Sequence, residues 1–206
     1  PVEEDGSAYM EVPALRSLFF VALDENDLAV KRMHSFHIMQ PGETTSCVGC
    51  HEQREHTPRP TGENLLAMQR PPSRVRPIPG VPEVIDFPRD IQPLLDRHCV
   101  TCHNYQRREG GVLLTGDLGS RWSHAYFHLF AYQQVGDGRN GLGNYAPRSI
   151  GSSASPLLDK FTEGHYGVEA TEDELLTLWL WIESGAPYAG SYAGLRNAED
   201  QKIDSS

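Results

Sequence analysis

The chain has 206 residues and a formal net charge of −10, with 18 Lys and Arg against 28 Asp and Glu. This length allows one or two domains with a buried core. The acidic balance argues against nucleic acid and anionic membrane surfaces as partners, and no run approaches the about 20 apolar residues of a membrane span. With 19 Gly, 15 Pro and only 38% hydrophobic residues, much of the chain is expected to be loop.

Residues 1 to about 45 are predicted to form short strands. The runs 8–12, 18–23 and 29–33 contain β-branched or aromatic residues, and the polar residues 24–27 form a turn between the second and third runs. Three strands do not easily close a sheet alone. We therefore expect this region to complete a larger domain upstream, with the first residue at a processing site or fragment boundary.

Proline is concentrated in one stretch. Seven of the fifteen prolines lie between Thr57 and Pro82. Proline fixes φ and removes a backbone donor, so neither a helix nor a central strand is expected there. The stretch predicts an extended surface linker and a domain boundary near residue 80, which gives domains 1–80 and 81–206.

The remainder of the chain predicts four helices. Asp90 is the expected N-cap of the first, which ends at Cys99, and the second covers residues 122–135. Residues 136–144 are a glycine-rich loop.

The third and fourth helices carry clearer boundary signals. Ser155 is the expected N-cap of the third, with Pro156 at its first position and Gly164 just past its end. Thr171 and Glu174 form a capping box at the start of the fourth.

All four cysteines belong to two C-x-x-C-H motifs, at residues 47–51 and 99–103. In this motif each cysteine sulfur adds to one haem vinyl group and the following histidine binds the iron. Two motifs that use every cysteine predict two covalently bound haem c groups. The attachment residues are Cys47 and Cys50 with His51, and Cys99 and Cys102 with His103.

Other uses of these cysteines fit less well. A four-cysteine zinc ribbon spaces its pairs about 15–20 residues apart, whereas residues 51–98 separate the pairs here. A thioredoxin-like redox pair needs one motif and no histidine, and two disulfides leave both histidines unexplained. Because haem c is attached outside the cytoplasm, the motifs also predict a periplasmic or extracellular location.

The ligand on the other side of each iron decides between functions. A filled position favours electron transfer, and an open one allows small molecules to bind. His165, after the third predicted helix, is the expected distal ligand of the second haem; the alternative is a histidine that interacts with the helix dipole. His37 is the candidate for the first haem. Strand alternation places it on one face with Met33, Ser35 and Met39. The remaining options are an open site or one of the side chains Met33, His34, Met39, His124 and His128.

Several segments resemble a known family. They are PVEEDGSAY (1–9), QPGE (40–43), SCVGCHE (46–52), RPPS (70–73), QPLLDRHCVTCH (92–103), GHYGV (164–168) and WIESGAPY (181–188). Together they resemble the C-terminal dihaem c-type cytochrome region of hydrazine synthase alpha subunit-like proteins, over nearly the whole chain.

The resemblance implies an upstream β-propeller domain and supports His165 as the distal partner of His103. It also implies that a tyrosine shortly after the first motif binds the iron, while the motif histidine binds zinc. Glu55 stands here where that tyrosine would be. We therefore expect His51 to bind the first iron, and the departure argues against hydrazine synthesis.

These observations predict an α+β protein that is rich in loops. A short β-rich N-terminal segment precedes a mainly α-helical, cytochrome c-like domain, and the chain carries two covalent haems. The expected function is electron transfer with redox partner proteins, and no catalytic residue is assigned. The alternatives are a haem enzyme, whose open first haem acts on a small nitrogen or oxygen species, and a self-assembling subunit of a conducting haem assembly.

Overall fold

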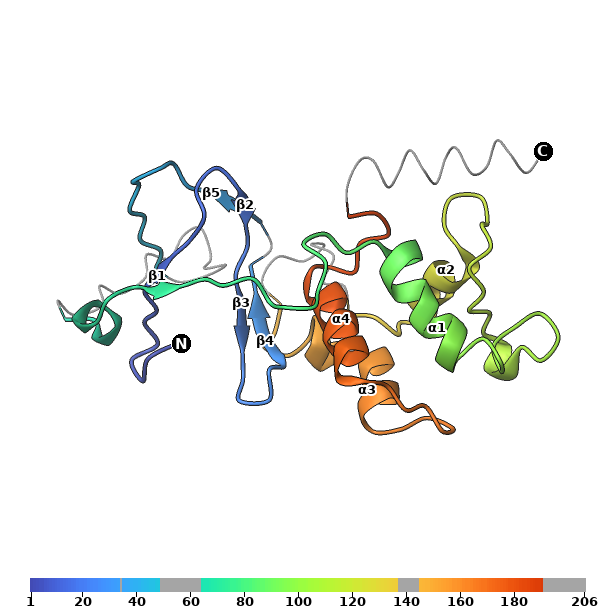
Figure 1. Ribbon diagram of the computed structural model, residues 1–206. Coiled ribbons are helices and arrows are strands. Elements are labelled where there is room, and N and C mark those ends of the chain that lie inside the picture. Colours follow the sequence, from blue (N-terminus) through green and yellow to red (C-terminus); the bar gives the residue numbers. More distant parts are fainter. Residues whose placement is uncertain (34, 49–63, 137–144, 191–206) are drawn as a thin grey trace. The chain divides into compact units, whose positions relative to one another are not determined.

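The computed structural model describes residues 1–33, 35–48, 64–136 and 145–190 (Figure 1). Within these ranges the fold is mixed α/β and rich in loops, with four α-helices and three two-stranded sheets. The described residues fall into two compact units, one of residues 1–20 and 33–79 and one of residues 21–32 and 80 onward. The expectation of a loop-rich protein with both helices and strands is therefore confirmed. The cytochrome c-like character of the second domain and the domain boundary at residue 80 stay predictions.

The first unit contains two short strand pairs. β1 (Met10–Glu11) pairs in parallel with β6 (Ser73–Arg74), and β2 (Ser17–Leu18) pairs antiparallel with β5 (His37–Ile38). Ala67 is the one fully buried residue among those described in this unit. The unit therefore buries little apolar surface with its own side chains.

The proline-rich stretch has more regular structure than predicted. A 3₁₀ helix (Leu66–Gln69) occupies its proline-free part, and β6 directly follows Pro71 and Pro72. In a two-stranded sheet each strand has one free edge. The backbone N–H groups that the neighbouring prolines lack are therefore not needed to pair β6 with β1. Residues 57–63 of the predicted linker lie outside the described residues.

The second unit begins with the predicted hairpin. β3 (Val21–Leu23) and β4 (Ala29–Arg32) are antiparallel. The Asp24 carboxylate fixes the turn by accepting the N–H groups of Asn26 and Leu28 at 2.9 and 3.0 Å. The predicted strand 18–23 is divided between β2 and β3, which pair with different partners.

The first helix starts earlier than predicted. A π-helical turn (Phe87–Ile91) leads into α1 (Gln92–His98). Asp90 therefore lies inside the helical segment and is not its N-cap. Its carboxylate accepts the N–H of Asp86 at 2.7 Å and pairs with Arg89 at the same distance.

The second helix, α2 (His124–Ala131), is shorter than the predicted 122–135. The Ser123 hydroxyl caps its start by accepting the N–H of Tyr126 at 3.3 Å. At its end Gln133 takes a left-handed conformation (φ 53°), and the N–H of Gln134 donates to the Leu129 carbonyl at 2.7 Å. This Schellman-type closure stops the helix before Val135.

The third helix, α3 (Pro156–Thr162), has the predicted boundaries but not the predicted cap. Ser155 occupies the N-cap position, yet its hydroxyl accepts the N–H of Gly136 at 2.9 Å and donates to the Gly151 carbonyl at 2.6 Å. The Ser155 side chain therefore joins two loops and does not cap the helix.

The fourth helix, α4 (Glu172–Glu183), carries the predicted capping box. Thr171 Oγ1 accepts the N–H of Glu174 at 3.3 Å, and the Glu174 carboxylate accepts the N–H of Thr171 at 2.9 Å. Figure 1 shows α4 beside α3, and the two helices are in contact.

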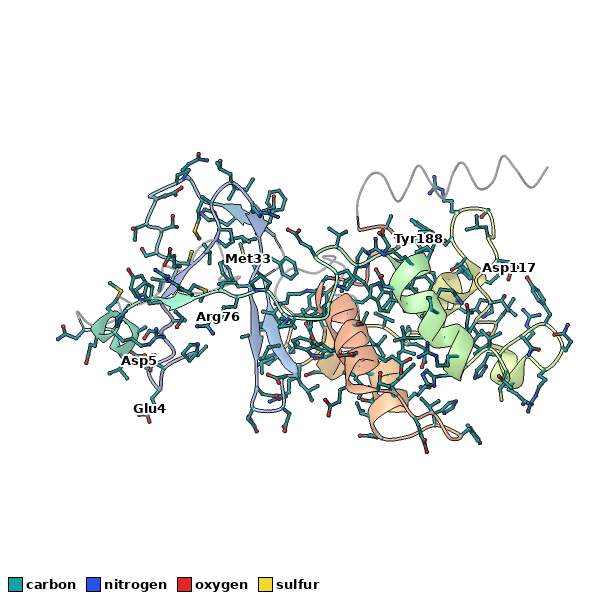
Figure 2. All side chains as sticks on the ribbon, in the orientation of Figure 1. Glu4, Asp5, Met33, Arg76, Asp117 and Tyr188 are labelled. Carbon is teal, nitrogen blue, oxygen red and sulfur yellow. The ribbon has the colours of Figure 1, made fainter. Side chains whose placement is uncertain are left out.

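An aromatic cluster forms the centre of the second unit. The Phe87 ring packs against Tyr126, Trp181 and Tyr188 (the last labelled in Figure 2), with ring centres 5.1, 5.4 and 5.9 Å apart. Buried aliphatic side chains from α1 to α4 surround it, namely Leu94, Leu95, Leu129, Leu157, Leu158, Leu178 and Ile182. This core fixes the helix that ends at the second motif.

Glu174 links the end of α1 to the start of α4. Burial raises the pKa of its carboxyl, but the Thr171 N–H, His98 and Arg97 outweigh burial and hold that pKa below 4.5. A lowered folded-state pKa stabilises the fold above about pH 4.5, and this contribution is lost as the pH falls through the folded value.

We expect Glu174→Gln to remove this pH dependence. The free energy of unfolding of the variant should fall less between pH 5 and pH 3 than that of the native protein, as measured by urea denaturation at each pH. Glu163→Gln, at an exposed position, should behave like the native chain. Parallel pH profiles for native protein and Glu174→Gln would contradict this role.

Candidate functional site

The second C-x-x-C-H motif forms a turn that continues directly from α1. The N–H of Cys99 donates to the Leu95 carbonyl at 2.8 Å, and those of Cys102 and His103 donate to the Cys99 carbonyl at 3.1 and 3.0 Å. The two cysteines are unpaired thiols and are half-buried. Burial raises the pKa of Cys99 to about 11, with Cys102 adding to the shift. The turn thus holds both thiols and the imidazole within five residues.

The tautomer of His103 follows from its partner. His103 Nδ1 lies 3.0 Å from the Glu109 carbonyl oxygen. A carbonyl only accepts hydrogen bonds, so Nδ1 carries the proton and Nε2 keeps its lone pair in the neutral ring. This is the arrangement in which a histidine binds a metal through Nε2 while the other nitrogen is held by a backbone carbonyl.

His165 lies beside His103, although the two are distant in the sequence. Their ring centres are 6.2 Å apart and their planes differ by 14°. Gly164 and Gly167, with φ of 96° and 84°, allow the tight turn that carries His165. Burial lowers the pKa of His165, with Lys160 and His103 adding to the effect, which favours the neutral ring that a metal ligand requires.

The spacing of these two rings fits a shared metal. A metal–imidazole bond is about 2 Å long, so imidazoles on opposite sides of one metal have ring centres roughly 6 Å apart. The observed separation and the nearly parallel planes match that geometry. The spacing of His103 and His165 would therefore suit two imidazole ligands of one metal ion.

His124 and His128, both on α2, have different surroundings. His128 is buried, and its Nδ1 accepts the N–H of Leu113 at 3.1 Å. In the neutral ring its Nε2 is therefore protonated and is not a ligand atom. His124 Nε2 lies 3.6 Å from the Asp117 carboxylate, which also accepts the Tyr105 hydroxyl (Asp117 is labelled in Figure 2).

The first motif is described only in part. Cys47 is exposed, whereas Cys50, His51 and also His34 lie outside the described residues. Within the part of the chain that the structure describes, no group of three or more His, Cys, Asp and Glu side chains is arranged to hold a metal ion.

One ring nitrogen of His37 makes no hydrogen bond among the described residues. This atom, Nε2, is buried. The expected continuous alternation is interrupted, because β4 ends at Arg32 and β5 starts at His37. His37, Met33 (labelled in Figure 2) and Met39 are nevertheless all half-buried.

The role of Glu109 was not predicted from the sequence. Its backbone carbonyl makes the contact with His103, so the side chain gives no signal. The only local hint is the pair Gly110 and Gly111, both with positive φ (63° and 74°), which turns the chain back toward the motif.

Comparison with known families gives one result. A family model described as the hydrazine synthase alpha subunit middle domain matches residues 1–52, which include the whole first motif. Residues 1–52 are thus similar to this domain of hydrazine synthase. Neither the curated proteins nor the solved structures contain a match. The match names the middle domain, so likeness to a C-terminal dihaem region stays a prediction.

None of the helices within the described residues has the length and hydropathy needed to cross a membrane.

Proposed function

We propose that this chain is a dihaem c-type cytochrome that transfers electrons. In this proposal Cys99 and Cys102 would attach the second haem, and His103 and His165 would bind its iron. The observation that carries the proposal is the His103–His165 pair, with ring centres 6.2 Å apart and planes 14° apart. A pair of imidazoles that fills both axial positions favours electron transfer over substrate binding.

A haem held by these residues would supply reversible transfer of one electron. The chain positions the ligands for this chemistry. The Glu109 carbonyl holds the Nδ1 proton of His103 and makes the ligand nitrogen more basic. The turn at Gly164 carries His165, whose ring centre lies 6.2 Å from that of His103.

For the first haem we propose attachment at Cys47 and Cys50, with His51 as the proximal ligand and His37 as the distal one. The buried, unpartnered Nε2 of His37 supports this assignment. A haem would also supply apolar surface to a unit whose described residues bury almost none. We further propose a periplasmic or extracellular location, redox proteins as partners, and assembly with an upstream β-propeller or with further copies of the chain.

Intact mass of the protein, expressed in a host that attaches haem c, tests the proposal. We expect the mass of the chain plus two haems, and the double variant Cys99→Ala, Cys102→Ala should lose one haem and keep the other. A native protein without covalent haem would contradict the proposal.

The match of residues 1–52 favours a second candidate, a hydrazine synthase-like enzyme whose first haem is open to a small nitrogen species. Carbon monoxide distinguishes the two. Rapid binding of this gas to the reduced native protein would support the enzyme. Its exclusion from both haems would support electron transfer.

A further inference from the structure

We propose that His128 is a positioning residue for the second haem, acting on the proximal ligand His103 through the loop 109–114. This inference rests on the proposed function, since it needs a haem bound by His103. His128 is buried and is not a haem ligand in the proposed function, so its role is otherwise unassigned.

Three hydrogen bonds fasten the loop to the second motif. The N–H of Glu109 donates to the Cys102 carbonyl at 3.2 Å, and the N–H of Leu114 donates to the His103 carbonyl at 2.8 Å. Between them the Glu109 carbonyl accepts the Nδ1 proton of His103 at 3.0 Å. The position of this loop therefore sets the length and direction of the hydrogen bond on the ligand.

The backbone of the loop does not fix this position by itself. Arg108, Gly110 and Gly111 all have positive φ, of 46°, 63° and 74°. Left-handed conformations cost energy at Arg108, and glycine allows many alternatives. Contacts from outside the loop must select the observed path.

Helix α2 and the residue that follows it supply two of those contacts, and the Gln92 side-chain amide of α1 supplies another by donating to the Leu114 carbonyl at 3.0 Å. His128 Nδ1 accepts the N–H of Leu113 at 3.1 Å in a buried setting, and Tyr132 donates its hydroxyl to the Gly111 carbonyl at 3.4 Å. Both Leu113 and His128 are at most 9% exposed. Because water cannot replace the His128 acceptor there, its loss leaves a buried N–H unpaired. The loop must then move to satisfy that group, and the Glu109 carbonyl moves with it.

The test compares three variants of the haem-loaded protein. His128→Leu removes the acceptor, and His128→Asn keeps an acceptor oxygen near the position of Nδ1. Leu129→Ala is the matched control, since Leu129 is a buried neighbour on the same helix whose apolar side chain cannot form a hydrogen bond with the loop. The readouts are the reduction potential of each haem and hydrogen exchange at the Leu113 amide.

We expect His128→Leu to raise the reduction potential of the second haem alone, because a weaker hydrogen bond on Nδ1 makes the ligand less basic. Leu113 exchange should accelerate by at least about tenfold. His128→Asn should restore both values toward native, and Leu129→Ala should lower stability without shifting the potential.

An unchanged second-haem potential in His128→Leu, with the haem still bound, would overturn this inference alone. Equal shifts in His128→Leu and Leu129→Ala would also overturn it, since the effect would then be general destabilisation. A native protein that carries no haem on the second motif would instead refute the proposed function.

Discussion

Replacing His165 with alanine is expected to convert the second haem from low-spin to high-spin. The substitution removes one of the two imidazoles that lie 6.2 Å apart, which leaves His103 as the only axial protein ligand. The optical and EPR spectra of the oxidised protein should show the change. The reduced variant should bind carbon monoxide at this haem, and added imidazole should restore the low-spin spectrum.

His124→Ala is the matched control. It removes another histidine of the second unit, one whose Nε2 lies 3.6 Å from the Asp117 carboxylate. Its spectra should equal those of the native protein. Low-spin spectra in His165→Ala without added imidazole, or a spin change in His124→Ala, would show that His165 is not the distal ligand.

The largest effect on stability is expected from Trp181→Ala. Trp181 is fully buried, its ring packs against Phe87, and its indole N–H donates to the Pro187 carbonyl at 2.8 Å. Truncation of a buried tryptophan to alanine lowers the free energy of unfolding by about 3–5 kcal/mol, because it leaves a cavity and an unpaired carbonyl. Urea denaturation of the haem-loaded protein, followed by far-UV circular dichroism, measures this change.

Phe127→Ala serves as its comparison. Phe127 is an aromatic residue of α2 in the same unit, but its side chain is 58% exposed. Substitutions at such surface positions change stability by about 0.5 kcal/mol or less. Similar losses in the two variants would place Trp181 outside the core of this unit.

Local signals in the sequence predicted several elements well. Thr171 and Glu174 form the expected capping box, because a serine or threonine with a glutamate three residues later satisfies two backbone donors at once. The hairpin turn at Asp24 and the end of α3 before Gly164 also follow from local chemistry.

Other features depended on tertiary contacts that the sequence does not display. Asp90 was expected to cap a helix, but Phe87 is drawn into the aromatic core and the helical segment starts there. Ser155 was expected to cap α3, but two loops compete for its hydroxyl. The Glu109 contact uses a backbone carbonyl, which any residue could provide.

The pairing of His103 with His165 was predicted only in part from the sequence. The motif marks His103, and the resemblance to a family supports His165, but only the packing of the second unit brings the two rings together. This pairing is the central claim of the proposed function.

EPR of the oxidised native protein tests this claim most directly. Imidazole planes only 14° apart predict a rhombic low-spin ferric signal from the second haem, which should disappear in His165→Ala. A high-spin signal from that haem in the native protein would contradict the assignment of His103 and His165 as its two axial ligands.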